Sequence, residues 1–374
     1  MAYGTVNADV VQSSVPGVSL GAGNASIMKN RIINGAMVID QRNAGASLAN
    51  TGVAIYSLDR WYIQGISASK FTCQQNAGSV TPPIGFTNYL GITSSAATTI
   101  NSSDYYLVQQ SIEGYNIADL GWGTANAKTV TLSFWVYSSL TGTFGGALRN
   151  GTATYSYPFT YTISSANTWT QISITVAGPT GSTWSTTNSS GFGVCFSLGA
   201  GSSFAGTAGS WTANNYISAT GATSVVGTSG ATFYITGVQL EVGSSATGFE
   251  YRQYQQELAL CQRYYWKNND PTATSTFIPC GNGYTFNTTT GTFQLSFPVT
   301  MRTRVATINF SNVRVFGASN GSSGVVTSVS GIQSTNTVFQ ADVAASSATF
   351  VTGTPAALQG NNNTAAYAEF SAEL

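Results

Sequence analysis

Apolar and polar residues alternate through the middle of the chain, and this alternation predicts β-strands. Every second residue from Val130 to Val136 is apolar, which places those side chains on one face of a strand. Residues 171–176 repeat the pattern, and segments rich in glycine, serine and threonine lie between such runs. About 200 residues of short strands and glycine-rich turns predict a two-sheet sandwich or jelly roll. We place this domain at residues 31–247.

One predicted strand, residues 232–240, changes the parity of its apolar positions at Gly237. A β-bulge at this glycine would return both halves of the strand to the same core. Helical periodicity is nearly missing from the domain, apart from a single turn near residues 115–120. These observations support an all-β fold.

A helix is predicted within residues 250–265. Tyr254, Leu258, Cys261 and Tyr265 recur at steps of four, three and four and form a narrow apolar stripe. The stripe packs either on its own sandwich or around a symmetry axis with copies of the chain. We place a helical connector at residues 248–266.

The β pattern resumes after the connector and continues to the last residue. Residues 284–286 and 293–297 flank a polar segment that predicts a hairpin. Residues 366–374 alternate to the end of the chain, so we expect a terminal strand whose loss destabilises its domain. Residues 267–374 are therefore predicted to form a second, smaller β-sandwich domain.

Residues 1–30 have no periodicity and too few large apolar side chains to bury a core of their own. They are predicted to form an extended arm, either a loose tail or an anchoring strap. Residues 1–18 carry no basic residue ahead of an apolar stretch, so a secretory signal is not expected. The candidate anchoring residues are Tyr3, Val10, Val11, Val15 and Pro16.

Composition narrows the possible functions. Charged residues make up 7% of the chain, compared with about 25% in typical proteins, and histidine is absent. The lack of histidine excludes Ser–His and Cys–His nucleophile pairs and His-containing zinc sites. A net charge of zero argues against binding of nucleic acid, and no run of about 20 apolar residues predicts a membrane span. An apolar content of 42% indicates a folded protein.

Enzymatic motifs are weak. Residues 17–21 fit the G-x-S-x-G spacing of a hydrolase, but that motif needs a histidine. Asp104, Glu113 and Asp119 are the only acidic cluster in a long neutral stretch, and their spacing selects no catalytic pair. We expect no enzyme; a depolymerase that uses these three acids is the alternative.

The cysteines and the charges near residue 50 favour structural roles. The four cysteines are widely spaced and are predicted to be buried thiols, with a Cys261–Cys280 disulfide as the alternative; they are Cys73, Cys195, Cys261 and Cys280. Four charges that flank a loop are candidates for structural ion pairs: Asp40, Arg42, Asp59 and Arg60.

Several short segments of the sequence, taken together, resemble a group of tailed-bacteriophage virion proteins. The matching segments lie in order at residues 30–37, 40–42, 58–61, 110–114, 131–136, 233–241, 249–252 and 257–265. The resemblance implies a tail-fibre or head-decoration protein with a jelly roll similar to carbohydrate-binding modules. It also implies a homotrimer on the exterior of the tail or capsid, assembled in the host cytoplasm and attached by its N-terminal arm.

The resemblance implies two functions: an adhesin that binds host-surface glycan, or a purely architectural capsid decoration or tail adaptor. The implied protein partners are a tail adaptor, the tail tube or nozzle, and a portal-proximal or capsid protein. No cofactor is expected; a Ca²⁺ ion between loops, as in related jelly rolls, is the alternative.

Sugar recognition uses aromatic faces, and five tryptophans are candidates for that role. Trp122, Trp184 and Trp211 lie among small polar residues in predicted loops and are the candidate glycan platforms. Trp135 and Trp169 are interpreted as core residues.

Overall fold

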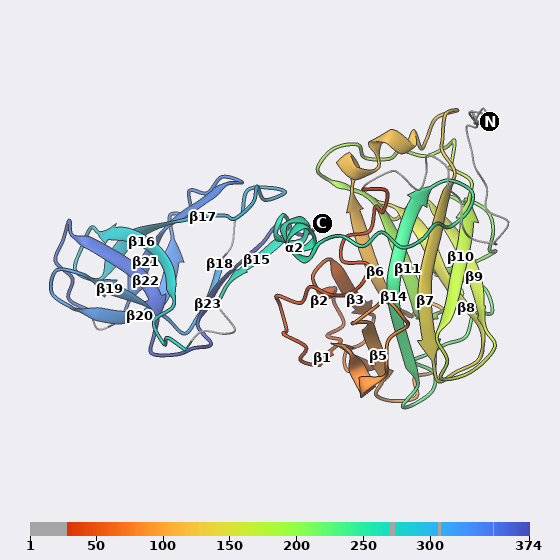
Figure 1. The fold of residues 1–374 in the computed structure, drawn as a ribbon, viewed down its shortest axis with the longest axis horizontal. Helices are drawn as coiled ribbons and strands as arrows, with labels where there is room; N and C mark the ends of the chain where they lie inside the picture. Colours follow the sequence, from red (N-terminus) through yellow and green to blue (C-terminus); the bar gives the residue numbers. More distant parts are fainter. Residues whose placement is uncertain (1–27, 270–273, 306–307, 347) are drawn as a thin grey trace, which may run out of the picture. The chain divides into compact units, whose positions relative to one another are not determined.

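The computed structural model describes residues 28–269, 274–305, 308–346 and 348–374 (Figure 1). The chain divides into two compact units, each described here by itself. The first extends to Tyr254 and includes Leu374, and the second comprises Gln255–Glu373. The boundary falls within the expected connector.

The first unit is a β-sandwich of two six-stranded sheets. The strands of the first sheet, in spatial order, are β1 (Leu48–Ala49), β4 (Phe71–Gln75), β5 (Leu90–Ser94), β14 (Thr232–Val242), β7 (Val130–Ser138) and β10 (Thr170–Val176). All their pairings are antiparallel. The predicted all-β fold and the strands near residues 130 and 172 are confirmed.

The second sheet has the same number of strands. Its spatial order is β2 (Ile55–Leu58), β3 (Trp61–Gly65), β6 (Tyr105–Glu113), β11 (Ser190–Ala200), β8 (Gly142–Asn150) and β9 (Ser156–Ile163). Long connections between strands carry short elements: η1 (Ala77–Ser79), η2 (Gly114–Asn116), η3 (Ala118–Leu120), and the parallel pair β12 (Ala205–Gly206) and β13 (Ser218–Ala219). The helical turn expected near residue 117 corresponds to η2 and η3.

Alternate residues of both sheets meet in one core. Leu132 and Phe134 on β7 are buried, and the ring of Phe134 packs edge-on against Phe196 of β11 at 4.9 Å. The residues between them on these strands point to the outer face of their sheet, because side chains alternate along a strand. This alternation gives the second sheet an outer face on which a ligand site can be built.

The bulge predicted at Gly237 is present. The pairing of β14 with β7 shifts register between Thr236 and Gln239, and Gly237 has φ 60°. A Cβ at this position would lie 2.6 Å from Phe86 Cζ. Glycine is therefore favoured both by the left-handed backbone and by the space available.

The predicted helix is α2, Tyr254–Gln262, and it is the one α-helix in the described ranges. Cys261 is fully buried, but Tyr254 is 58% exposed and Tyr265 belongs to the following strand. The prediction of an apolar stripe over four residues is therefore wrong in part. The helix ends before Tyr265, and Tyr254 at its start is exposed. No helix among the described residues has the length and hydropathy that crossing a bilayer requires.

The second unit contains a closed six-stranded barrel rather than the expected β-sandwich. Its strands follow the order β16 (Pro279–Thr285), β17 (Thr290–Ser296), β21 (Val338–Ala345), β20 (Ser323–Ser330), β19 (Val313–Gly317) and β22 (Pro355–Gly360). The ladder between β22 and β16 closes the barrel. The predicted hairpin is confirmed, because β16 pairs with β17 and Asn287 Oδ1 accepts from the amides of Thr289 and Thr290.

A three-stranded sheet completes the second unit. Strand β23 (Tyr367–Ser371) lies between β15 (Tyr265–Asn268) and β18 (Ile308–Ser311). Phe370 is fully buried on β23, where its ring stacks on Trp266 at 5.3 Å. The expected terminal strand is therefore present and central in its sheet.

The four cysteines are buried and form no disulfide, which confirms the prediction of buried thiols and contradicts the Cys261–Cys280 disulfide. Three of the four charged residues that flank the loop near residue 50 form hydrogen bonds with backbone groups. Asp40 accepts from the amides of Asn43 (2.9 Å) and Gly45 (2.6 Å), and Asp59 accepts from Gln41 N at 2.7 Å. The Arg60 guanidinium donates to the backbone oxygen of Ser111, and Arg42 lies over the Tyr56 ring. The ion-pair assignment for these four residues stays a prediction.

Candidate functional site

A cleft of about 400 Å³ lies on the outer face of the second sheet. Its floor comes from the neighbouring strands β3, β6, β11 and β8, and one wall comes from the connection between β11 and β14. The volume of the cleft lies within the range of small-molecule sites. Its lining includes Tyr62, Tyr105, Leu107, Gln109, Ser111, Arg149, Phe204, Asn215 and Ile217.

The register of the sheet aligns the polar floor. Tyr62 on β3 pairs with Gln109 on β6, and Gly193 on β11 pairs with both Ser111 on β6 and Arg149 on β8. Core residues alternate with these positions, so the named side chains share the outer face. Four strands that are distant in sequence thus contribute to one surface.

Arg149 forms the polar centre of the cleft. Its Nη1 donates to Asn215 Oδ1 at 2.7 Å, and its Nη2 donates to Gln109 Oε1. Gly193 lies between β8 and β6, and a Cβ there would lie 2.6 Å from Gln109 Nε2. The glycine therefore provides the space in which the guanidinium and the Gln109 amide meet across β11.

Tyr62 adds a hydroxyl group to the polar floor. Burial raises the pKa of Tyr62 to about 12, although the charge of Arg149 and hydrogen bonds with Ser111 and Arg149 oppose this rise. The phenol consequently stays protonated at neutral pH and retains its capacity both to donate and to accept.

The other end of the cleft is apolar. The rings of Tyr105 and Phe204 lie 4.9 Å apart, and Leu107 and Ile217 pack beneath them in a small buried cluster. Gln64 Nε2 donates to Tyr105 Oη at 3.0 Å, which fixes the ring at the rim. The cleft therefore combines directional hydrogen-bonding groups with apolar and aromatic surface.

Two of the three tryptophans proposed as glycan platforms are not exposed. Trp122 and Trp184 are 6% and 8% exposed and belong to the sandwich core, while Trp211 is half-buried. Their rings meet edge-on at 4.9 to 5.5 Å. The expected exposure of Trp122 and Trp184 is wrong, because their loops converge and cover one another; the assignment of the three as glycan-binding residues stays a prediction.

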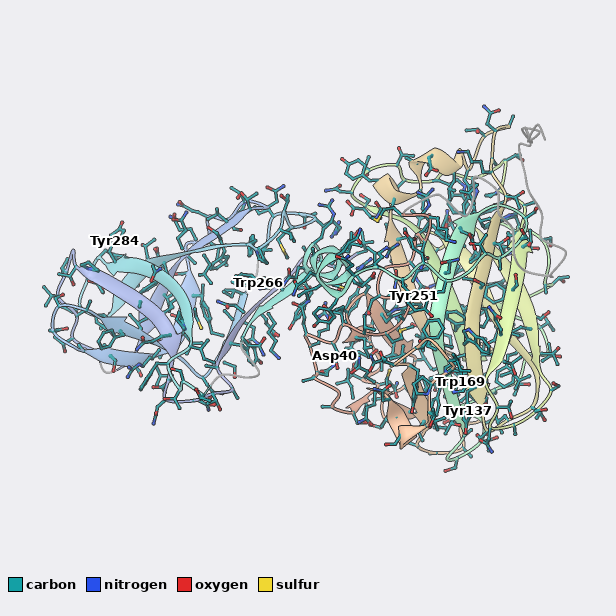
Figure 2. All side chains as sticks on the ribbon, viewed as in Figure 1. Asp40, Tyr137, Trp169, Tyr251, Trp266 and Tyr284 are labelled. Atoms are coloured by element: carbon teal, nitrogen blue, oxygen red, sulfur yellow. The ribbon has the colours of Figure 1, made fainter. Side chains whose placement is uncertain are left out.

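Trp135 and Trp169 lie on the outer face of the first sheet and are half-buried, not core residues. Figure 2 shows Trp169 beside Tyr137, and their ring centres are 5.5 Å apart. Tyr137 stacks on Tyr234, which stacks on Tyr89. Trp169 Nε1 donates to Thr81 O at 2.9 Å, so the segment before β5 covers part of this aromatic stack.

The three acids considered for catalysis have structural contacts. Asp104 accepts from the backbone and side-chain amides of Asn101 at 2.8 and 2.9 Å, and Asp119 pairs with Arg31 at 2.8 Å. Asp104 precedes β6 and Glu113 ends it, a separation of roughly 30 Å along an extended strand. These two cannot act on one glycosidic bond, which needs carboxylates within about 10 Å.

The candidate anchoring residues Tyr3, Val10, Val11, Val15 and Pro16 lie outside the described residues. For the calcium alternative, no group of three His, Cys, Asp or Glu side chains that could hold a metal is found in the part of the chain that is described.

Sequence reasoning missed the residues of the cleft. One signal was present: Arg149 is the only charged residue between Lys128 and Glu241. A single charge in so long a neutral stretch points to a specific role, but its partners on β6 and in the β11–β14 connection depend on register between distant strands.

No family model and no curated protein matches the chain. Solved structures show distant likeness. One is the enzymatically active domain of tailspike protein 4 from bacteriophage CBA120, with 12% identity and a TM-score of 0.30. The match covers 57% of this chain and 22% of that domain, so this chain spans about a fifth of that domain's length.

Two further likenesses cover whole structures. A putative sugar binding protein from Bacteroides thetaiotaomicron has 12% identity and a TM-score of 0.33, with 57% of this chain and 100% of that one covered. A family 11 carbohydrate-binding module from Clostridium thermocellum has 12% identity and a TM-score of 0.26, with 53% and 100% covered. TM-scores of this size do not bear on what this chain binds.

Proposed function

We propose that this chain is a non-enzymatic virion structural protein that binds host-surface glycan in the cleft of its first unit. The observation that carries glycan binding is the pairing, within one cleft, of a polar floor around Arg149 with an aromatic end formed by Tyr105 and Phe204. Sugar rings need both, because their hydroxyl groups form directional hydrogen bonds while their C–H faces pack on aromatic rings.

The virion placement rests on the resemblance of the sequence to tailed-phage proteins. In this proposal the N-terminal arm attaches a homotrimer to the tail, and the β units face outwards. The low charge content suits such an exterior, because a surface with few charges changes little with ionic strength or pH.

Calorimetry and a glycan array with the purified full chain test the binding. Tyr105→Ala and Gln109→Ala remove one element each from the aromatic and polar ends, and we expect each to lower affinity at least tenfold. Tyr284→Ala is the matched control, because this tyrosine is 54% exposed and belongs to the second unit, which contributes no residue to the cleft lining. Equal affinities of all four proteins would contradict a site in this cleft.

The second candidate is an architectural capsid decoration or tail adaptor. It predicts that the isolated protein binds no glycan at high micromolar concentration, yet rebinds particles stripped of it through residues 1–30. A truncated chain beginning at residue 28, compared with the full chain in the same rebinding assay, distinguishes this role.

A further inference from the structure

Arg149 is a buried cation whose partners are neutral. It is 8% exposed, and the groups recorded around it are the side-chain oxygens of Gln109 and Asn215 and the phenol of Tyr62. Among the described residues, no carboxylate comes within 4 Å of its guanidinium to form an ion pair. No carboxylate in direct contact therefore neutralises this charge.

An uncompensated charge is costly to hold inside a protein. Removing an ion from water costs several kcal/mol unless a counter-charge and hydrogen bonds replace the lost solvation. The guanidinium has five N–H donors, and its buried Nε has no acceptor. Neutral oxygens thus satisfy only part of the hydrogen-bonding capacity of Arg149. Because Arg149 lines the cleft, a ligand can reach its guanidinium group.

The surroundings favour an anion over a neutral group. Arg149 is the only charged side chain among the cleft residues; the main-chain carboxylate of Leu374 also lines the cleft, but it forms no ion pair with Arg149. The Tyr62 phenol also lines the cleft and remains a donor at neutral pH. The positive charge and this hydroxyl group thus lie in the same cleft.

We infer that the cleft selects an acidic saccharide, with Arg149 pairing the carboxylate of a uronic or sialic acid residue. This inference rests on the proposed glycan binding and names its ligand class. The planar guanidinium matches a carboxylate in geometry, and such pairs are the stronger hydrogen bonds of proteins. The sugar ring that carries the carboxylate would then lie toward Tyr105 and Phe204.

The test compares ligands that differ in charge alone. Calorimetry with an α-1,4-linked trigalacturonate and its methyl ester, and with 3′-sialyllactose and the methyl ester of its sialic acid, keeps each sugar framework constant. We expect at least one acid to bind about tenfold or more tightly than its neutral counterpart. Arg149→Gln should abolish this preference, and Arg149→Lys should retain part of it because the charge remains.

The outcomes separate the two proposals. Equal binding of acid and neutral partners would overturn acid selection and leave glycan binding intact, whereas binding of no glycan would overturn both. Preference for a sulfated glycan over both carboxylates would overturn the carboxylate assignment. Melting curves show whether Arg149→Gln folds; if it does not, the ester comparison on the unmodified protein still decides the question.

Discussion

Gly193 pairs directly with Arg149 in the ladder between β11 and β8, and the missing side chain of the glycine leaves room for Arg149 to reach Gln109 on β6. The polar centre of the cleft therefore depends on a residue that contributes no functional group. This relationship makes the site sensitive to a single added methyl group.

Gly193→Ala should weaken ligand binding with little loss of stability. The new Cβ would lie 2.6 Å from Gln109 Nε2, so the flexible Gln109 side chain must move and release Arg149. We expect affinity to fall about tenfold in calorimetry. Gly248→Ala is the control, because nothing lies within 4 Å of its Cβ position, and a similar loss there would refute the explanation.

Gly237→Ala should destabilise the first unit. The left-handed backbone costs about 1–2 kcal/mol with a side chain, and the contact with Phe86 adds to this cost. Gly230→Ala has a similar φ of 74° but open space around it, so it measures the backbone cost alone. Urea denaturation should show the larger loss for Gly237→Ala; equal losses would mean that Phe86 yields without cost.

Trp122→Phe should lower stability without changing glycan affinity. The indole is buried and its Nε1 donates to Lys128 O at 2.8 Å, so the variant leaves a cavity and removes the donor of this hydrogen bond. A cost of about 1–3 kcal/mol is expected. A selective loss of glycan binding in a fully stable variant would instead support Trp122 as a platform.

Phe370→Ala should destabilise the second unit by about 3–5 kcal/mol. Its ring contacts Trp266, Phe297 and Phe339, and deletion of residues 370–374 should have a larger effect. Tyr284→Ala, at an exposed position, should cost less than about 0.5 kcal/mol. An unchanged melting curve for the deletion would show that β23 is dispensable.

Stability should fall at alkaline pH because two thiols are buried. Burial raises the pKa of Cys73 to about 12 and that of Cys195 to about 11. The unfolded chain releases these protons near pH 9 while the folded chain keeps them, so their contribution is complete below pH 9 and declines as pH rises toward 11–12. When the pH rises from 8 to 10.5, each thiol should lower the free energy of unfolding by about 2 kcal/mol.

Urea denaturation of the parent protein and of Cys73→Ala and Cys195→Ala at both pH values isolates this effect from the titration of tyrosines and lysines. Each variant should be less stable at pH 8 but lose less stability on going to pH 10.5. The same loss in all three proteins would show that the thiols are not its source.

Local patterns predicted several of the strands, and the remaining features depend on pairing between residues that are distant in sequence. Alternation from Val130 to Val136 and the parity change at Gly237 are visible in the sequence because each depends on a few neighbouring residues. The barrel was not predicted, because its closure requires Pro279 to meet Gln359 across 80 positions.

The same limit applies to the candidate site. Glycine- and serine-rich surroundings suggested exposure of Trp122 and Trp184, but three loops that are distant in sequence bury them together. Arg149 was recognisable by its isolation in a neutral stretch, whereas its meeting with Gln109 and Asn215 follows from the order of strands in the sheet.

Closure of the barrel has a consequence for how copies of the second unit meet. Every one of its six strands has a hydrogen-bonded neighbour on both sides, so the barrel offers no open edge to a strand from an adjacent copy. Edge-to-edge pairing is a common route to aggregation of β proteins. Neighbouring copies can therefore meet the barrel through its side chains, while its backbone remains closed to strand exchange.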